Sequence, residues 1–258
     1  MNALLTPIQW LGARTLEAVR AVAEVFALLY GAAVVLAFVR TRGFRVTLEI
    51  GVAQTLFTGV HALGIVSLGA LAMGILIIQQ ATTYLPTVEL ASAVATQVLV
   101  RDVIPLMVGV ILLGRSGTAI CVELAGMKLS GEIDALRSMG MPLEQVVVLP
   151  RLIAGALSAC VLTIYGLAVA IGVGYMVTKA LSSLPFALEA LINALETRDM
   201  IEALCKAFLF GTSMVLVAIR EGYSVQASAR EVPQATTRAV VRSMAVMLVC
   251  NSLITVAF

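Results

Sequence analysis

The segment GRSGTAICVELAGMKLSGEIDALRSMGMPLEQVVVLPR, residues 114–151, separates two long apolar parts of the chain. It combines glycines with acidic and basic side chains, whereas aliphatic residues dominate the sequence on both sides. Because charged side chains are unfavourable in the hydrocarbon core of a bilayer, this segment is expected outside the bilayer or against protein. The sequence therefore predicts a polar loop here, with membrane spans before and after it.

The composition indicates a helical membrane protein with a single transmembrane domain. Of the 258 residues, 60% are hydrophobic and only 12% are charged, whereas about a quarter are charged in a typical soluble domain. The apolar runs are continuous and do not alternate over ~10 residues, as the strands of an outer-membrane β-barrel do. The small net charge of +2 gives no indication of nucleic-acid binding.

Five hydrophobic segments are predicted to cross the membrane as helices. They lie near residues 53–78, 88–113, 152–177, 204–219 and 239–258. In the first, glycines 59, 64, 69 and 74 permit close approach of a neighbouring helix. Lys206, at the start of the short fourth segment, is expected to snorkel to the membrane surface.

The N-terminal region, about residues 4–45, is predicted to be an interfacial elbow. Residues 21–39 are long enough to span, but Glu24 interrupts them and basic residues flank both ends. A span would place the two basic groups on opposite sides of the membrane, against the positive-inside tendency. We favour a helix lying in the interface, and the alternative is a sixth span.

The distribution of basic residues predicts the orientation of the chain. Thirteen of the 17 Lys and Arg residues fall within residues 14–45, 115–151 or 220–242. The positive-inside tendency places these three regions in the cytoplasm. The N-terminus is then cytoplasmic, and five spans place the C-terminus on the outer side.

Residues 130–140, SGEIDALRSMG, predict a short helix within the central segment. Ser130 is a suitable N-cap, and Gly140 is a suitable stop with Pro142 soon after it. Apolar residues recur at positions 133, 136 and 139, while acidic residues occupy the first turn. A helix this short is unstable alone in water and must dock on another surface.

Two surfaces can receive this helix: the membrane or its own bundle, or a groove on a cytoplasmic partner. The acidic first turn favours the partner, because anionic lipid headgroups repel acidic side chains. The residues expected to make the partner contact are Glu132, Ile133, Asp134, Leu136, Arg137 and Met139.

Arg101 and Asp102 lie inside the predicted second span, where ionisable groups usually face protein or water. They either neutralise each other or charged groups on neighbouring helices, or they line the path of a polar or amphiphilic substrate. In the second case, Arg101 could meet a lipid phosphate while small residues leave room for acyl chains.

Neither catalysis nor a metal or other cofactor is expected of this chain. His61 is the only histidine, the four cysteines have no ligand spacing, and no nucleophile or acid cluster suggests an intramembrane enzyme. No G-x-x-x-x-G-K-[ST] motif occurs, so ATP hydrolysis would require another subunit. An ion-coupled secondary carrier remains as the alternative, although no internal repeat supports it.

Several motifs are similar to those of one permease family. They are G-R-S-G at 114–117, Glu123, Met127, E-I-D-A-L at 132–136, Pro150-Arg151, A-T-T-R-A-V-V at 235–241 and T-T-Y at 82–84. Together they resemble the MlaE/YrbE-type permeases, which are the membrane subunits of ABC transporters that work with MCE proteins on lipids. One motif departs from the family: R-E-L-G-P is Arg101-Asp102-Val103-Ile104-Pro105 here.

The resemblance implies a homodimeric permease for phospholipid in the bacterial inner membrane, with a periplasmic C-terminus. It further implies a cytoplasmic ABC ATPase bound to the coupling helix, residues 130–140, and a periplasmic MCE-domain protein. The lipid cavity that it implies is lined by Arg101, Asp102, Tyr84, Met73, Gln80 and Ala81.

Overall fold

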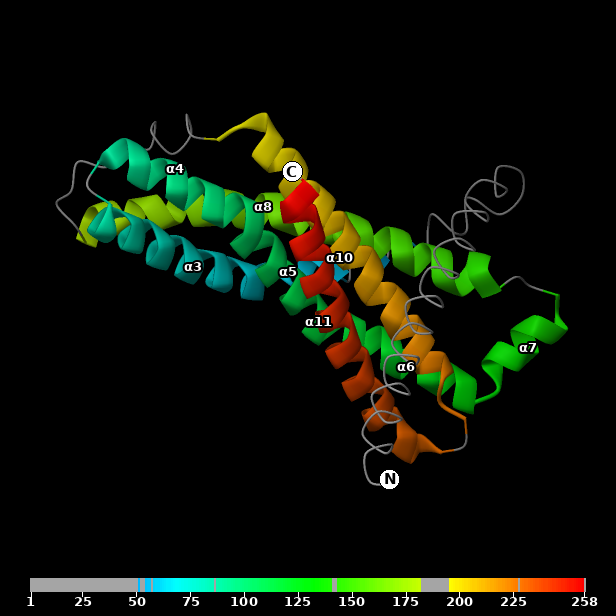
Figure 1. Ribbon diagram of the computed structural model, residues 1–258. Helices are drawn as coiled ribbons and strands as arrows, with labels where there is room; N and C mark the ends of the chain where they lie inside the picture. Colours follow the sequence, from blue (N-terminus) through cyan, green and yellow to red (C-terminus); the bar gives the residue numbers. More distant parts are fainter. Residues whose placement is uncertain are drawn as a thin grey trace, which may run out of the picture.

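A computed structural model describes residues 51, 54–56, 58–85, 87–140, 143–181, 195–226 and 228–257. Within these residues the chain is helical and contains no strand, and five helices are long and apolar enough to cross a membrane (Figure 1). These candidate spans are Gln54–Tyr84, Leu90–Leu129, Val146–Val177, Thr197–Tyr223 and Ala229–Val256. The predicted all-α membrane fold with five spans is confirmed. The elbow predicted at residues 4–45 lies outside the described residues.

The first two spans form an antiparallel pair. The helix α3 (Leu63–Tyr84) is followed by a short turn and by α4 (Val88–Val98), whose first turn is capped by the Thr87 side chain. From α4 the chain stays helical without interruption, through alternating π-helical and α-helical segments. These are η1 (Leu99–Val103), α5 (Ile104–Leu112), η2 (Leu113–Gly117) and α6 (Thr118–Leu129).

This second helix is longer than predicted, and the prediction of a loop beginning at Gly114 is wrong. Its candidate span covers 40 residues, or ~60 Å of helix at 1.5 Å per residue. Because a hydrocarbon core is only about 30 Å thick, the helix extends well beyond it, and the charged residues of 114–129 fall on this extension. A polar sequence after a span can therefore remain helical.

The rest of the central segment is short. The helix α7 (Glu132–Ser138) stands apart from the main bundle axis in Figure 1, and η3 (Glu144–Val148) leads into α8 (Leu149–Leu181). The fourth span is α10 (Thr197–Tyr223), which begins seven residues before the predicted position of 204. A capping box between Glu196 and Asp199 determines its start. The turn η4 (Ala229–Glu231) precedes α11 (Val232–Ala257).

The helix α10 lies at the centre of the bundle and packs against α5, α6, α8 and α11. Of its apolar window, 67% is buried, whereas the corresponding share in α11 is only 17%. Glycine permits the closest helix contacts: a side chain at Gly211 of α10 would strike the backbone of Gly155 in α8. Gly74 of α3 meets α8 in the same way, but Gly64 has no such neighbour in the described structure. Gly59 and Gly69 also face neighbouring helices, at Ser158 and Met107, but only Gly74 meets backbone.

Candidate functional site

Arg101 and Asp102 lie in η1, a π-helical turn in the middle of the second span. The Arg101 Nε donates a hydrogen bond to Asp199 Oδ1 at 2.6 Å, and it lies 3.6 Å from Glu202 Oε2. Asp199 and Glu202 are buried in the first two turns of α10. Arg101 therefore pairs with α10 and not with its neighbour Asp102.

Lys206 of α10 completes this group. Its side chain is fully buried, and Nζ donates to Asp102 Oδ1 at 2.8 Å, to the Arg101 carbonyl at 2.9 Å and to Thr255 Oγ1 at 2.8 Å. The ammonium also lies 2.7 Å from Glu202 Oε1. The prediction that Lys206 snorkels is wrong, because its ammonium is held between η1, α10 and α11.

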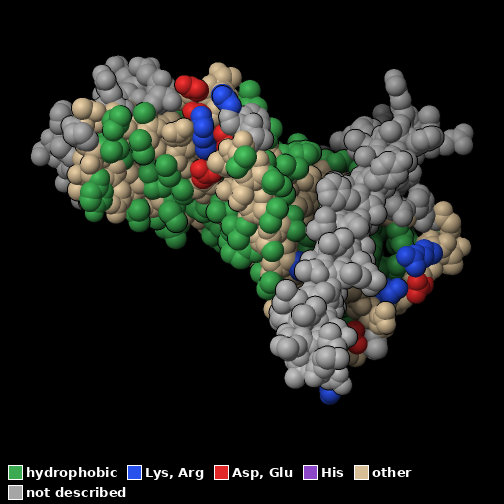
Figure 2. Space-filling model, viewed as in Figure 1, with side chains coloured by type: hydrophobic (Ala, Val, Ile, Leu, Met, Phe, Trp, Pro, Cys, Tyr) green, Lys and Arg blue, Asp and Glu red, His purple; other side chains and the backbone are tan. Residues whose placement is uncertain are grey.

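We call these five side chains the outer ionic cluster: Arg101, Asp102, Asp199, Glu202 and Lys206. Three acids face two bases, which matches the alternative in which Arg101 and Asp102 neutralise groups on a neighbouring helix. The cluster is not sealed, since 23% of the Arg101 side chain and 42% of the Asp102 side chain are exposed. Figure 2 shows acidic and basic side chains together in a break in the hydrophobic surface at this end of the bundle.

Three further predicted substrate residues share one exposed face of α3. Met73, Gln80 and Tyr84 are separated by seven and four positions, which places them on one side of a helix. Tyr84 is 78% exposed, and Gln80 and Tyr84 line a shallow hollow of about 320 Å³ together with Leu76, Gln79 and Thr83. Ala81 points the other way, into the buried core. The structure thus groups three of these four residues and separates Ala81 from them.

The helix α7 begins differently from the prediction. Its N-cap is Gly131 at φ 77°, a left-handed conformation that favours glycine, and not Ser130. The Ser130 hydroxyl instead donates to the Met127 carbonyl at 3.3 Å and to Glu132 Oε1 at 2.9 Å. Ser130 thus ends α6, and Gly131 turns the chain. The predicted stop at Gly140 agrees with the structure, where Gly140 has φ 71°.

The predicted coupling residues divide between two sides of α7. Ile133 is buried and Leu136 is partly buried against the core. Met139 is 60% exposed, and Asp134 and Arg137 form an exposed ion pair of 3.8 Å. Part of the apolar stripe therefore anchors α7 to its own bundle, while the charged side is left for another surface. Glu132 is exposed at the first turn.

A hollow of about 650 Å³ separates α7 from α6 and the start of α8. Glu123 and Arg151 line it, and Arg151 Nη2 donates to Glu123 Oε1 at 2.7 Å. Arg151 also donates to the Val147 carbonyl at 2.9 Å. These two residues were separate motif positions in the sequence, and the fold joins them across 28 positions.

A second ionic cluster, not found from the sequence, lies at the same end of the bundle as α7. The Glu221 carboxylate at the end of α10 is buried and accepts from three arginines. We call Glu221 with Arg220, Arg238 and Arg242 the inner arginine cluster. The only signal in the sequence was the spacing of Arg238 and Arg242, which places both on one face of a helix.

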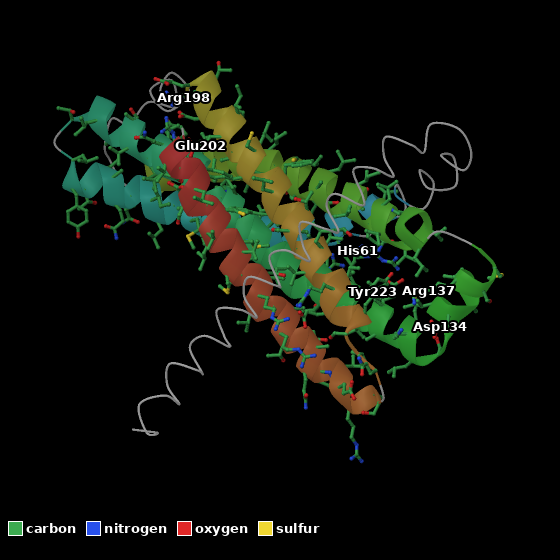
Figure 3. All side chains as sticks on the ribbon, turned by 45° about the vertical axis from the view of Figure 1, so that its right-hand side comes forward. His61, Asp134, Arg137, Arg198, Glu202 and Tyr223 are labelled. Atoms are coloured by element: carbon green, nitrogen blue, oxygen red, sulfur yellow. The ribbon has the colours of Figure 1, made fainter. Side chains whose placement is uncertain are left out.

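Figure 3 places the two clusters at opposite ends of α10: Arg198 and Glu202 lie at one end, and Tyr223 lies at the other with Asp134 and Arg137 of α7. One end of the bundle therefore has buried acids and a partly open arginine. The other end has the inner arginine cluster and the short helix α7.

Comparison with known proteins assigns this architecture to a family. The family model Permease MlaE matches residues 51–257. The chain belongs to the MlaE permease family. It is 31% identical over 218 residues to a probable ABC transporter permease protein of Rickettsia prowazekii, covering 82% of this chain and 83% of the relative. It is 26% identical over 254 residues to the intermembrane phospholipid transport system permease protein MlaE of Haemophilus influenzae, covering 96% and 95%.

A third relative, matched over a shorter stretch, is the chloroplast protein TRIGALACTOSYLDIACYLGLYCEROL 1 of Arabidopsis thaliana. It is 27% identical over 146 residues, which cover 56% of this chain and 42% of the relative. The sequence motifs have defined places in this MlaE-family fold. E-I-D-A-L forms most of α7, Glu123 pairs with Arg151, and A-T-T-R-A-V-V forms the first turns of α11.

Proposed function

We propose that this chain is the permease subunit of an ATP-driven phospholipid transporter. The observation that carries the proposal is the MlaE family match over residues 51–257, together with the phospholipid system named for the Haemophilus relative. The transporter would be a homodimer of this chain in the bacterial inner membrane, with a cytoplasmic ABC ATPase and a periplasmic MCE-domain protein. The ATPase would supply the energy, and lipid would pass between the membrane and the MCE protein.

The helix α7 is proposed to be the coupling helix that receives the motion of the ATPase. Its buried Ile133 holds it to the bundle, so a displacement of α7 would be passed to α6, against which α7 packs. Asp134, Arg137 and Met139 are exposed and available to the ATPase. Placing α7 in the cytoplasm also places most of the basic residues there, as the positive-inside tendency requires. The C-terminus would then be periplasmic.

The exposed face of α3 and the open edge of the outer ionic cluster are proposed to contact the transported lipid. Met73, Gln80 and Tyr84 offer an apolar side with polar groups near its end. Arg101 is partly exposed, so it could approach a lipid phosphate while still bound to α10. Asp102 would orient Lys206 and the π-helical turn, and Ala81 would act only through packing.

The coupling assignment can be tested on the complex extracted from membranes. Asp134→Lys with Met139→Asp changes only exposed side chains of α7, so the permease should fold and assemble as the unaltered chain does. We expect lipid-stimulated ATP hydrolysis and lipid transfer to fall at least tenfold, about the loss produced by removing 1.4 kcal/mol of coupling energy. Arg230→Glu, in the η4 turn and away from α7, is the matched control. Unchanged coupling in the α7 variant would refute the assignment.

A further inference from the structure

The inner arginine cluster carries more positive charge than its single acid can balance. Glu221 is 1% exposed, and its Oε1 accepts from Arg220 at 2.6 Å and from Arg242. Its Oε2 accepts from the Arg238 Nε at 3.2 Å. Arg220 has further contacts, but in the described part of the chain Glu221 is the one carboxylate paired with Arg238 and Arg242, so these two arginines carry an excess of positive charge. The outer ionic cluster, in contrast, has more acids than bases.

Two of these arginines present unused donors to the surface. The side chains of Arg238 and Arg242 are 43% and 38% exposed. Apart from Glu221, Arg238 contacts only the Ser224 hydroxyl at 3.5 Å, and Arg242 has no other polar partner in the described part of the chain. Because a guanidinium has five N–H donors in a rigid fork, several remain for an anion. Glu221 holds the guanidinium groups of Arg238 and Arg242 side by side.

A hollow of about 400 Å³ lies directly on these arginines. It is lined by Gln234, Thr237, Arg238, Val241 and Arg242 of α11. Arginine forks bind phosphate oxygens with good geometry, and the Gln234 amide adds further donors. These donors therefore favour a phosphate group over a cation.

The same face of α11 changes from polar to apolar along its length. After Arg238, Val241, Met244 and Leu248 follow at intervals of three and four positions and are all exposed. From Arg238 to Leu248 the helix rises ~15 Å, which is about half of a 30 Å hydrocarbon core. The face thus has the length and polarity of a single lipid in one leaflet, with its phosphate at the level of the arginines.

We propose that this face of α11 is a binding site for an anionic phospholipid of the leaflet at the α7 end. The headgroup phosphate would bind Arg238 and Arg242, and an acyl chain would lie along Val241, Met244 and Leu248. A zwitterionic lipid would bind less well, because its own cation is repelled by the excess positive charge of Arg238 and Arg242. The site rests on the five-span fold and on this cluster, and not on the transport of lipid.

Native mass spectrometry of the purified protein can test the site. The protein is loaded with equal amounts of phosphatidylglycerol and phosphatidylcholine with matched acyl chains, and the retained lipids are compared. The unaltered chain should retain phosphatidylglycerol preferentially. With Arg238→Gln and Arg242→Gln together, phosphatidylglycerol binding should weaken roughly 25-fold, because each basic residue at a membrane surface contributes about a fivefold effect. An unchanged lipid ratio would overturn the proposal.

A second variant avoids disturbing Glu221. Val241→Glu alters a side chain that is 63% exposed, so it should fold, and its carboxylate should repel the headgroup or compete for the arginines. It should lower phosphatidylglycerol retention at least tenfold. If it retains the lipid as the unaltered chain does, the site is wrong even where the double arginine variant fails to fold.

Two controls and one competition distinguish this site from the outer ionic cluster and from a simple anion site. Arg230→Gln removes one exposed arginine at the same end of the bundle, outside the hollow, and should leave retention unchanged. Arg101→Gln tests the proposed transport site at the outer cluster: if this variant loses the phosphatidylglycerol preference while the Arg238 and Arg242 variant keeps it, the selective lipid belongs to the transport site instead. Inorganic phosphate should compete at least a hundredfold more weakly than the lipid. Equal competition would show that the arginines bind an anion without a lipid chain.

Discussion

Lys206→Met is the most informative perturbation of this fold, because Lys206 joins three helices through one buried ammonium. The substitution keeps an unbranched apolar stem of similar length but removes the charge. Among the described residues, it leaves Glu202, which is 1% exposed, with only Arg101 at 3.6 Å as an ionic partner. Asp102 loses its partner too, but 42% of its side chain is exposed, so water can compensate.

The magnitude follows mainly from the buried carboxylate. Removing one partner of a buried ion pair costs about 3–5 kcal/mol, because the remaining charge stays desolvated. For a chain of this size, each kcal/mol corresponds to a change in melting temperature of about 2–4 °C. The melting temperature of Lys206→Met should therefore fall by about 6–20 °C.

The fall can be measured with a thiol-reactive dye in detergent, since Cys121 is free and buried and reacts once the bundle opens. Adding Glu202→Gln to Lys206→Met should recover at least half of the loss, because the uncompensated buried charge is then removed. Lys128→Met is the matched control. Lys128 lies at the end of α6, where the described structure gives it no ion pair, and its loss should shift the melting temperature by less than 2 °C.

The reasoning would be refuted if Lys206→Met melted within 2 °C of the unaltered chain. It would equally fail if the second substitution gave no recovery, since the loss would then come from packing and not from charge.

Two further perturbations test the geometry of the bundle and of α7. Gly211→Leu should prevent the contact of α10 with α8, because even a Cβ there strikes the backbone of Gly155. Size-exclusion chromatography should then show no monodisperse protein. The control Gly64→Leu should be tolerated, because Gly64 has no close neighbour in the described structure. Gly131→Ala places a side chain at φ 77° and costs about 1 kcal/mol, so we expect faster proteolysis around α7 with little change in the melting temperature of the bundle. Unchanged proteolysis would show that the turn does not need glycine.

The helix α7 shows which local features can be predicted. Gly140 was identified as a stop because few other residues adopt a positive φ there, and the structure has that conformation. The N-cap was predicted at Ser130 but lies at Gly131. Serine and glycine are both common at helix termini, and only the path of the chain out of α6 decides between them. The apolar stripe was visible, but the sequence could not show that Ile133 packs on the chain's own core.

The ionic groups show where prediction from the sequence ends. Arg101 and Asp102 were found because charges are rare in an apolar run, but their partners Asp199 and Glu202 lie before the predicted fourth span, and Lys206 at its start was expected to snorkel. Those partners lie about 100 positions away, and a membrane helix tolerates them only because the opposite charges meet in space. The same holds for Glu221, whose two arginine partners on α11 lie 17 and 21 positions away.

The sequence by itself determined the class of the fold, the number of spans, the family motifs and the short helix between the second and third spans. These properties depend on hydrophobicity, on glycine conformation and on local spacing, all of which act over a few residues. The tertiary structure decided the two ionic clusters, whereas the early start of α10 follows from the local capping box of Glu196 and Asp199. Each cluster depends on which charged groups meet across the bundle, and only packing brings such distant groups within the 3–4 Å at which their charges compensate one another.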